Sequence, residues 1–91
     1  MARFDFRPRR PRIKVVERKL GQDRAWGIAT APDLIELDSS LKGSRRLVYL
    51  IHEALHLAKW DLPEADVRRI STEIGEVLWR DNYRRADQGD K

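Results

Sequence analysis

Along this 91-residue chain, the apolar residues change from an alternating spacing in the first half to a helical spacing in the second. Three short runs in the first half, residues 13–19, 25–30 and 34–38, are rich in β-branched and apolar side chains and partly alternate with polar ones. Such runs are typical of half-buried strands. Gly27 inside the second run indicates a bulge or a close approach by another group. We therefore predict three consecutive strands, and their short links favour a small antiparallel sheet.

The second half of the chain predicts two helices. Residues 45–59 carry apolar side chains three and four positions apart, which form one face of a helix: Leu47, Leu50, Ile51, Ala54, Leu55 and Ala58. A second stripe of this kind runs along residues 63–83, with Gly75 outside it: Val67, Ile70, Ile74, Val77 and Leu78. Each helix is therefore expected to bury one side against the rest of the domain.

Capping residues mark the ends of these helices. Ser44 is a suitable N-cap for the first helix. Asp61, followed three residues later by Glu64, resembles a capping box for the second. The tight link at residues 60–62 predicts that the two helices form an antiparallel hairpin. The expected fold class is therefore α+β, with a small antiparallel three-stranded sheet followed by one helix and an antiparallel supporting helix.

Length and composition indicate one small domain with a modest core. Pro8 and Pro11 exclude a helix at the basic start of the chain, because proline and the residue before it adopt extended conformations. We expect residues 1–11 to form a basic, partly ordered N-terminal arm, residues 12–85 the single domain, and residues 86–91 a frayed tail.

The chain has no cysteine, which excludes disulfides, cysteine-ligated zinc and thiol nucleophiles. Its first residues lack the apolar segment of a secretory signal. No apolar run approaches the ~20 residues that span a bilayer. We therefore expect a soluble, cytoplasmic protein with no membrane segment.

Positive charge is concentrated at the start of the chain. Residues 1–19 carry eight basic and two acidic side chains, a net +6, whereas the whole chain carries +4 and the remainder therefore −2. A basic segment of this kind either aids solubility or contacts phosphates and acidic partners. Both interpretations of residues 1–19 stay open, the second with nucleic acid or an acidic protein as partner.

Both histidines lie in one pentapeptide of the first predicted helix, His52-Glu53-Ala54-Leu55-His56. Residues four apart lie on the same face of a helix, so the two imidazoles can bind one metal ion. Glu53 can then reach a water held by that ion. Typical composition gives this H-E-x-x-H pattern by chance in roughly a few chains of this length per thousand. The pattern predicts a zinc site on a metal-binding helix.

The third zinc ligand has to be a carboxylate, because the chain has no other histidine and no cysteine. A catalytic zinc normally has three protein ligands and a water. In a hairpin that turns at its short link, Glu64 and Asp66 lie near the height of His56, whereas Glu73 lies nearly one turn beyond His52. Periodicity does not choose between the first two carboxylates. We favour Glu64 for its longer reach; the alternative is that it only starts the second helix.

The segment Leu50-Ile51-His52-Glu53-Ala54-Leu55-His56, preceded by the strand-like run 34–38, resembles the zincin metallopeptidases. With no third histidine and an acidic residue downstream, it is similar to the glutamate-ligated branch, the gluzincins. It also resembles the very small metallopeptidases encoded by phages and bacteria, which have a Trp-Arg pair near their end, as at Trp79 and Arg80. The resemblance spans about residues 13–80.

The chain departs from the gluzincins in two respects. It lacks the Asn-Glu segment that supplies the third ligand in longer members, so Glu64 is carried over by position only. It also has no C-terminal subdomain to close a cleft, so that substrate pockets are expected to be shallow or supplied by a partner.

The resemblance implies a zinc-dependent metallopeptidase that hydrolyses peptide bonds of a peptide or protein substrate. It implies Zn²⁺ at His52 and His56, Glu53 as the general base, and a strand near the metal helix as the border of the substrate cleft. The oxyanion that forms during hydrolysis needs a further donor. Tyr49, Tyr83 and the arginines of the second helix are the open alternatives for this donor.

Two functions of other classes remain open. The chain could be a zinc-containing module that binds nucleic acid or another partner through its basic arm without catalysis; a DNA-associated protease similar to the SprT-like group would combine both activities. It could also be a degenerate zincin that acts as a binding protein. A structural zinc needs neither Glu53 nor an open coordination position, so these two features distinguish the hypotheses.

Overall fold

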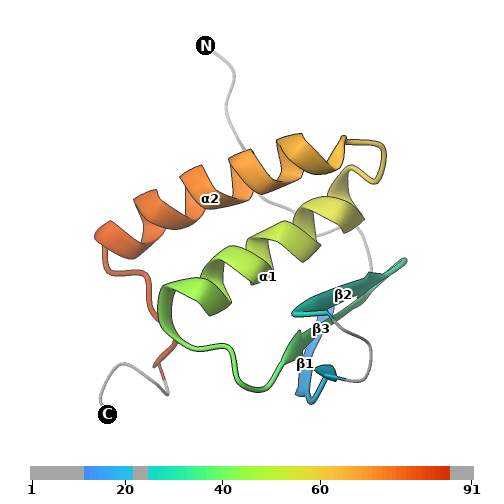
Figure 1. Cartoon of the computed structure of the whole chain (residues 1–91), viewed down its shortest axis with the longest axis horizontal. Coiled ribbons are helices and arrows are strands. Elements are labelled where there is room, and N and C mark those ends of the chain that lie inside the picture. Colours follow the sequence, from blue (N-terminus) through green and yellow to red (C-terminus); the bar gives the residue numbers. More distant parts are fainter. Residues whose placement is uncertain (1–11, 22–24, 87–91) are drawn as a thin grey trace.

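The computed structural model describes residues 12–21 and 25–86, which form a three-stranded sheet and two helices (Figure 1). In chain order, the elements are β1 (Lys14–Arg18), β2 (Gly27–Thr30), β3 (Leu34–Asp38), α1 (Gly43–Ala58) and α2 (Glu64–Arg80). Helix α1 lies between the sheet and α2 (Figure 1). The predicted α+β class is confirmed. The predicted arm, residues 1–11, and nearly all of the predicted tail lie outside the described residues.

The sheet is mixed, so the predicted antiparallel meander is wrong. Strand β3 lies in the centre, antiparallel to β2 and parallel to β1. The turn between β2 and β3 is short, so these two strands pair antiparallel, as expected. The link between β1 and β2 is longer, and β1 pairs with β3 rather than with β2. The central place suits β3, because it alone carries fully buried side chains, Ile35 and Leu37, on its inner face. Every residue of β1 is exposed, as on an edge strand.

The core between the sheet and α1 is small. Ile35, Leu37 and Leu41 are buried in it, and partly buried side chains of α1 pack on them: Tyr49, Leu50, Ala54 and Leu57. The sheet therefore holds the side of α1 that carries these residues, and it fixes the direction in which the neighbouring histidines point. None of the described helices is both long enough and apolar enough to cross a bilayer.

Helix α1 begins at Gly43, two residues before the predicted start at residue 45, so Ser44 lies inside the helix. Gly43 has a φ of 60°, a left-handed conformation that glycine adopts without strain, and Lys42 occupies the N-cap without a side-chain hydrogen bond. The Cβ of any side chain at Gly43 would lie 3.7 Å from Cη2 of Trp79, so the start of α1 also packs closely on α2. The predicted Ser44 cap is therefore wrong.

The predicted capping box of α2 is also wrong. Pro63 occupies its N-cap without a side-chain hydrogen bond. Asp61 accepts a hydrogen bond of 2.8 Å from Nζ of Lys59 instead, and the Glu64 carboxylate lies against the two histidines. The two carboxylates thus have other partners than the helix backbone.

Helix α2 ends at Arg80 rather than near Tyr83. Asn82 has a φ of 68°, the amide of Tyr83 donates to the carbonyl of Leu78 at 3.0 Å, and the amide of Asn82 donates to that of Trp79 at 3.1 Å. This pair of bonds is a Schellman motif, which terminates a helix at a left-handed residue.

The face that α2 turns toward α1 differs from the predicted apolar stripe. Val67, Ser71 and Gly75 are its buried residues, whereas Ile74 is exposed and 64% of Val77 is exposed. A Cβ on Gly75 would lie only 2.6 Å from Cγ2 of Val48. Small side chains therefore let the two helices approach closely, and this approach brings the start of α2 to the histidines.

Candidate metal centre

His52, His56 and Glu64 offer ligand atoms that all lie within 4.8 Å of one another, so this group could hold a metal ion. The two histidines occupy successive turns of α1, and Glu64 is the first residue of α2. Nε2 of His52 lies 3.1 Å from Oε2 of Glu64, and Nε2 of His56 lies 3.1 Å from Oε1. The carboxylate therefore bridges the two imidazoles.

These distances fit a zinc ion. Ligand atoms about 2 Å from a tetrahedral zinc lie roughly 3.4 Å apart. The observed separations of 3.1 Å are close to this value, and they are also ordinary hydrogen-bond distances. Two imidazole nitrogens and one carboxylate oxygen are a donor set that zinc accepts, and they leave a fourth position for another ligand. The side chains present thus suit the ion that the sequence predicts.

The structure separates the two other carboxylates from this group. Asp66 lies 3.9 Å from Nη2 of Arg69, and Glu73 lies 3.7 Å from Nη1 of the same arginine. Among the described residues, neither carboxylate belongs to the cluster around the histidines. Of the three carboxylates weighed from the sequence, Glu64 is the one that the fold brings to His52 and His56.

Burial shifts the pKa values of His52 and Glu53 in opposite directions. Burial lowers the pKa of His52, and the Glu64 carboxylate partly opposes this shift. A neutral imidazole is the form that binds a metal. Burial raises the pKa of Glu53, with His56 opposing the shift and Glu64 adding to it. The carboxylate of Glu53 is therefore a stronger base than an exposed glutamate.

Glu53 is 7% exposed, and its carboxyl group lies directly against β2. A Cβ on Gly27 would lie 2.9 Å from both Cγ and Oε2 of Glu53. The close approach expected at Gly27 is therefore found, and the group that approaches is the predicted catalytic carboxylate. Because β2 has β3 on one side only, Gly27 stands on an edge strand of the described sheet.

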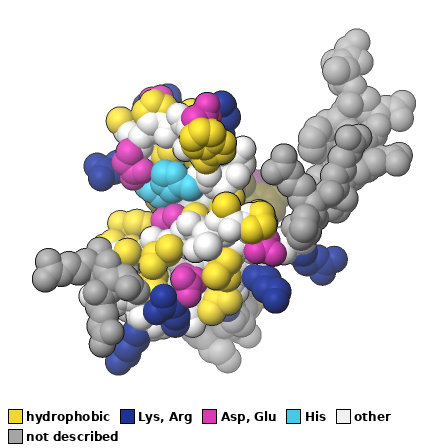
Figure 2. Space-filling view, turned by 90° about the vertical axis from the view of Figure 1, so that its right-hand side faces the viewer, with side chains coloured by type: hydrophobic (Ala, Val, Ile, Leu, Met, Phe, Trp, Pro, Cys, Tyr) yellow, Lys and Arg dark blue, Asp and Glu magenta, His cyan; other side chains and the backbone are white. Residues whose placement is uncertain are grey.

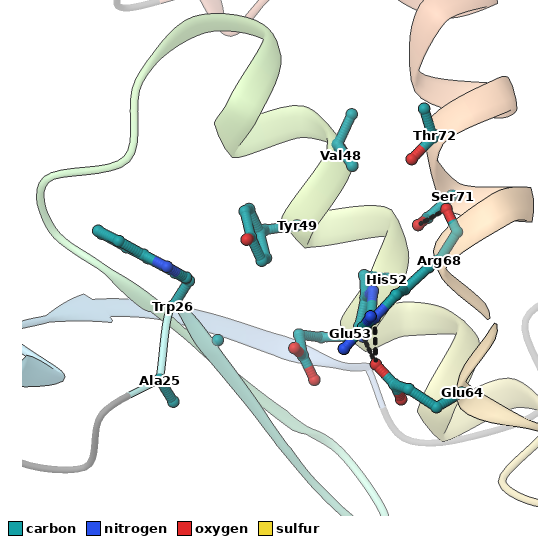
Figure 3. A pocket seen from close by; sticks show the side chains of 11 residues that line it. Ala25, Trp26, Val48, Tyr49, His52, Glu53, Glu64, Arg68, Ser71 and Thr72 are labelled. Carbon is teal, nitrogen blue, oxygen red and sulfur yellow. Dashed lines mark hydrogen bonds and ion pairs between the residues drawn. The ribbon is translucent and has the colours of Figure 1, made fainter.

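A pocket of about 500 Å³ opens beside these residues (Figure 3). It is lined from the segment at β2, from α1 and from α2: Ala25, Trp26, Gly27, Val48, Tyr49, His52, Glu53, Glu64, Arg68, Ser71 and Thr72. The imidazoles reach the surface with acidic side chains next to them (Figure 2). A ligand of moderate size can therefore contact the histidines from solvent.

Two of the three alternatives for an oxyanion donor lie at this pocket. The Tyr49 ring lies between those of Trp26 and His52, with centroids 6.4 and 6.3 Å away. Nε of Arg68 lies 3.5 Å from Oε2 of Glu64. Tyr83 instead lines a different pocket, at the opposite end of the helical hairpin. The structure therefore places Tyr49 and Arg68 near the histidines and Tyr83 away from them.

No protein-family model, no curated protein and no solved structure matches this chain. A function therefore has to be inferred from the geometry and chemistry of the site itself.

Proposed function

We propose that this chain is a zinc-dependent metallopeptidase. The observation that carries the proposal is the meeting of three ligand side chains, His52, His56 and Glu64, at a pocket that Glu53 also lines. A purely structural site would not need a buried carboxylate beside it. The raised pKa of Glu53 and its place next to an edge strand both suit a general base.

In the proposed hydrolysis, the residues of the site have three roles: metal ligands, general base and hydrogen-bond donors. His52, His56 and Glu64 would hold the ion, and a bound zinc would supply Lewis acidity toward water and a carbonyl group. Glu53 takes a proton from the attacking water and returns it to the leaving amine. Tyr49 and Arg68 line the same pocket and supply donors for the developing oxyanion.

The substrate in this proposal is an extended peptide. Gly27 of β2 lines the pocket, and one edge of β2 pairs with no other strand of the described residues. An extended peptide can pair with such an edge through backbone hydrogen bonds. Trp26 and Tyr49 add aromatic surface on the same side. The pocket is open to solvent, so few side chains of the protein would contact the side chains of the peptide, and sequence specificity would be low.

The test combines a metal measurement with a cleavage measurement. Elemental analysis of protein purified without chelator should find about one zinc per chain, and His56→Ala should lose it. Wild-type protein should cleave members of a peptide library, read by mass spectrometry. Glu53→Gln should keep the zinc and lose at least ~10²-fold in rate, because it removes the base but keeps the shape of the side chain.

Glu73→Gln is the matched control, since it makes the same change at an exposed carboxylate outside the group. It should leave both zinc content and cleavage unchanged. A wild-type protein that holds zinc but cleaves nothing would contradict the peptidase and support a metal with a structural role. Stoichiometric zinc in His56→Ala would contradict the assigned ligands.

A further inference from the structure

A cluster of basic side chains lies at the end of the helical hairpin opposite the histidines. It combines the start of α1 with the end of α2, which are far apart in sequence but adjacent in the antiparallel hairpin (Figure 1). We call this cluster the basic end: Lys42, Arg45, Arg46, Arg80, Arg84 and Arg85. His56 lies thirteen residues beyond Gly43 along α1, so about 20 Å separates the two ends.

Contacts within the cluster show that its two halves meet. Oε2 of Glu17, on β1, accepts a hydrogen bond from Nε of Arg46 at 2.7 Å and another from Nη1 of Arg85. Arg46, Arg84 and Arg85 line one pocket of about 250 Å³ together with Trp79 and Tyr83. Arg46, Arg84 and Arg85 therefore share one surface, and Arg80 lines a second pocket that also joins the two helices.

Carboxylates balance only part of this charge. Glu17 pairs with Arg46 and Arg85. Within the described ranges, no ion pair joins Lys42, Arg45, Arg80 or Arg84 to an acidic side chain. The basic end thus keeps an excess of positive charge that faces solvent, because these four residues are exposed.

The placement of the cations opposes the local stability of α1. The first turn of a helix is the positive end of its dipole, where acidic side chains are favourable and basic ones are not. The first turn of α1 contains no acidic residue, and it has no side-chain cap. Arg45 and Arg46 stand there instead. Residues that reduce the stability of their own helix or strand are characteristic of functional surfaces.

Two arginines of the basic end each pack on an aromatic ring. The Arg84 guanidinium lies 3.3 Å from the centroid of the Trp79 ring, and the Arg45 guanidinium lies 4.8 Å from that of Trp26. Tyr83, 61% exposed, stands beside them. Proteins that bind single strands combine phosphate-binding cations with aromatic faces on which bases stack. The guanidinium group also matches phosphate geometry better than an ammonium group.

We propose that the basic end binds single-stranded nucleic acid. Its arginines contact successive phosphates, and the exposed ring of Tyr83 offers stacking surface for a base. This surface lies apart from His52, His56 and Glu64, and it meets their pocket only where Arg45 packs on Trp26. The proposal does not depend on the peptidase activity. The proposed second binding site consists of residues outside the basic segment 1–19. Only Glu17 of that segment takes part, because it accepts hydrogen bonds from two arginines of the basic end.

The test is a fluorescence anisotropy titration of a labelled 20-nucleotide oligothymidylate with the full chain at several NaCl concentrations. Lys42→Gln/Arg80→Gln removes two exposed cations that make no ion pair within the described part of the chain. It should weaken binding at least tenfold at low salt. The slope of log K against log[NaCl] should fall by about 1.4, since each single-strand contact contributes about 0.7.

The matched control is Lys59→Gln/Arg69→Gln, which removes two exposed positive charges at the other end of the hairpin. It should change affinity less than twofold. Tyr83→Leu should weaken binding without changing the salt slope, because stacking releases no counterions. Circular dichroism verifies that each variant is folded.

Three results would overturn the proposal. The first is an equal loss of oligothymidylate affinity in both double variants, which would show that binding depends only on the net charge of the protein. The second is unchanged binding in Lys42→Gln/Arg80→Gln, which would place the contact elsewhere, including the basic segment 1–11. The third is stronger displacement of the label by a polyglutamate peptide than by unlabelled oligothymidylate, which would assign the basic end to an acidic protein.

Discussion

Gly27 on β2 and Glu53 on α1 are in such close contact that no side chain fits between them. A Cβ on Gly27 would lie 2.9 Å from Cγ and Oε2 of Glu53, well inside ordinary van der Waals distance. Because residue 27 is glycine, the Glu53 carboxyl group can lie directly against the strand, and any larger side chain there would displace it. This contact fixes where the carboxyl group of Glu53 can stand relative to the histidines.

We expect Gly27→Ala to reduce cleavage at least about tenfold while zinc content is unchanged, because the methyl group displaces the carboxyl group of the base. A displacement of about 1 Å in a catalytic group can cost as much as 10²-fold. Rate measurements and elemental analysis on the same sample test this. Gly21→Ala is the control, since a Cβ there meets nothing within 4 Å. Equal cleavage by both variants would show that the position of Glu53 is not critical.

A second prediction concerns Glu64. Glu64→Ala should weaken zinc binding by more than about 100-fold, because it removes one of three protein ligands. Asp66→Ala and Glu73→Ala should leave the affinity nearly intact, since both carboxylates face Arg69 instead. Competition with a zinc chelator measures all three. If Glu64→Ala keeps its affinity and loses only ~1 kcal/mol of stability, the residue merely starts α2.

A third prediction concerns the helix contact at Gly75. Gly75→Ala should destabilise the domain by about 1–3 kcal/mol, although alanine is the better helix former, because its methyl group overlaps Val48. Chemical denaturation measures the loss. The same substitution in a Val48→Ala background should cost clearly less, which is the coupling expected of two residues in contact. Additive effects would contradict the close approach of the helices.

A fourth prediction follows from Glu17, which links β1 to the start of α1 and to Arg85. The hydrogen bond from Arg46 lowers the pKa of Glu17 below its ordinary value of 4.5, against the opposing effect of burial. A lowered pKa in the folded state means stability that is present above pH 4.5 and is lost as the pH falls through the lowered value. Glu17 is partly exposed, so the contribution is about 1 kcal/mol or less.

Glu17→Gln should therefore be less stable than wild type at pH 7 by up to ~1 kcal/mol, and the difference should vanish near pH 2. Denaturant titrations at several pH values measure it. Glu76→Gln is the control, because its carboxylate makes no ion pair within the residues that the structure describes. A difference between wild type and Glu17→Gln that persists undiminished at pH 2 would mean that the ion pairs are not its source.

The sequence predicts those features that depend on neighbours along the chain. Alternation in residues 34–38 marks β3, the helical repeat marks α1, and the four-residue spacing places His52 and His56 on one face. These patterns operate within a single element, so no tertiary information is needed to read them.

Features that depend on packing between elements were predicted less well. Strand β1 pairs with β3 because β3, with its buried inner face, takes the central place in the sheet. The residues of β1 itself do not indicate this partner or its direction. The apolar repeat of α2 misplaces the contact with α1, because Ser71 and Gly75 owe their place to small size rather than to hydrophobicity. Gly27 indicates a close approach, but only the fold shows that Glu53 makes it.

The arrangement of α2 has a further consequence for any metal that the site holds. Among the described elements, this helix makes its extensive contacts with α1, so the sheet contributes little to keeping Glu64 beside the histidines. An ion bound by all three residues would join the two helices beside the short link that connects them. Its release would then follow local detachment of α2 rather than unfolding of the whole domain. Amide hydrogen exchange near the start of α2 would slow when the ion is bound, while exchange in β3 would hardly change.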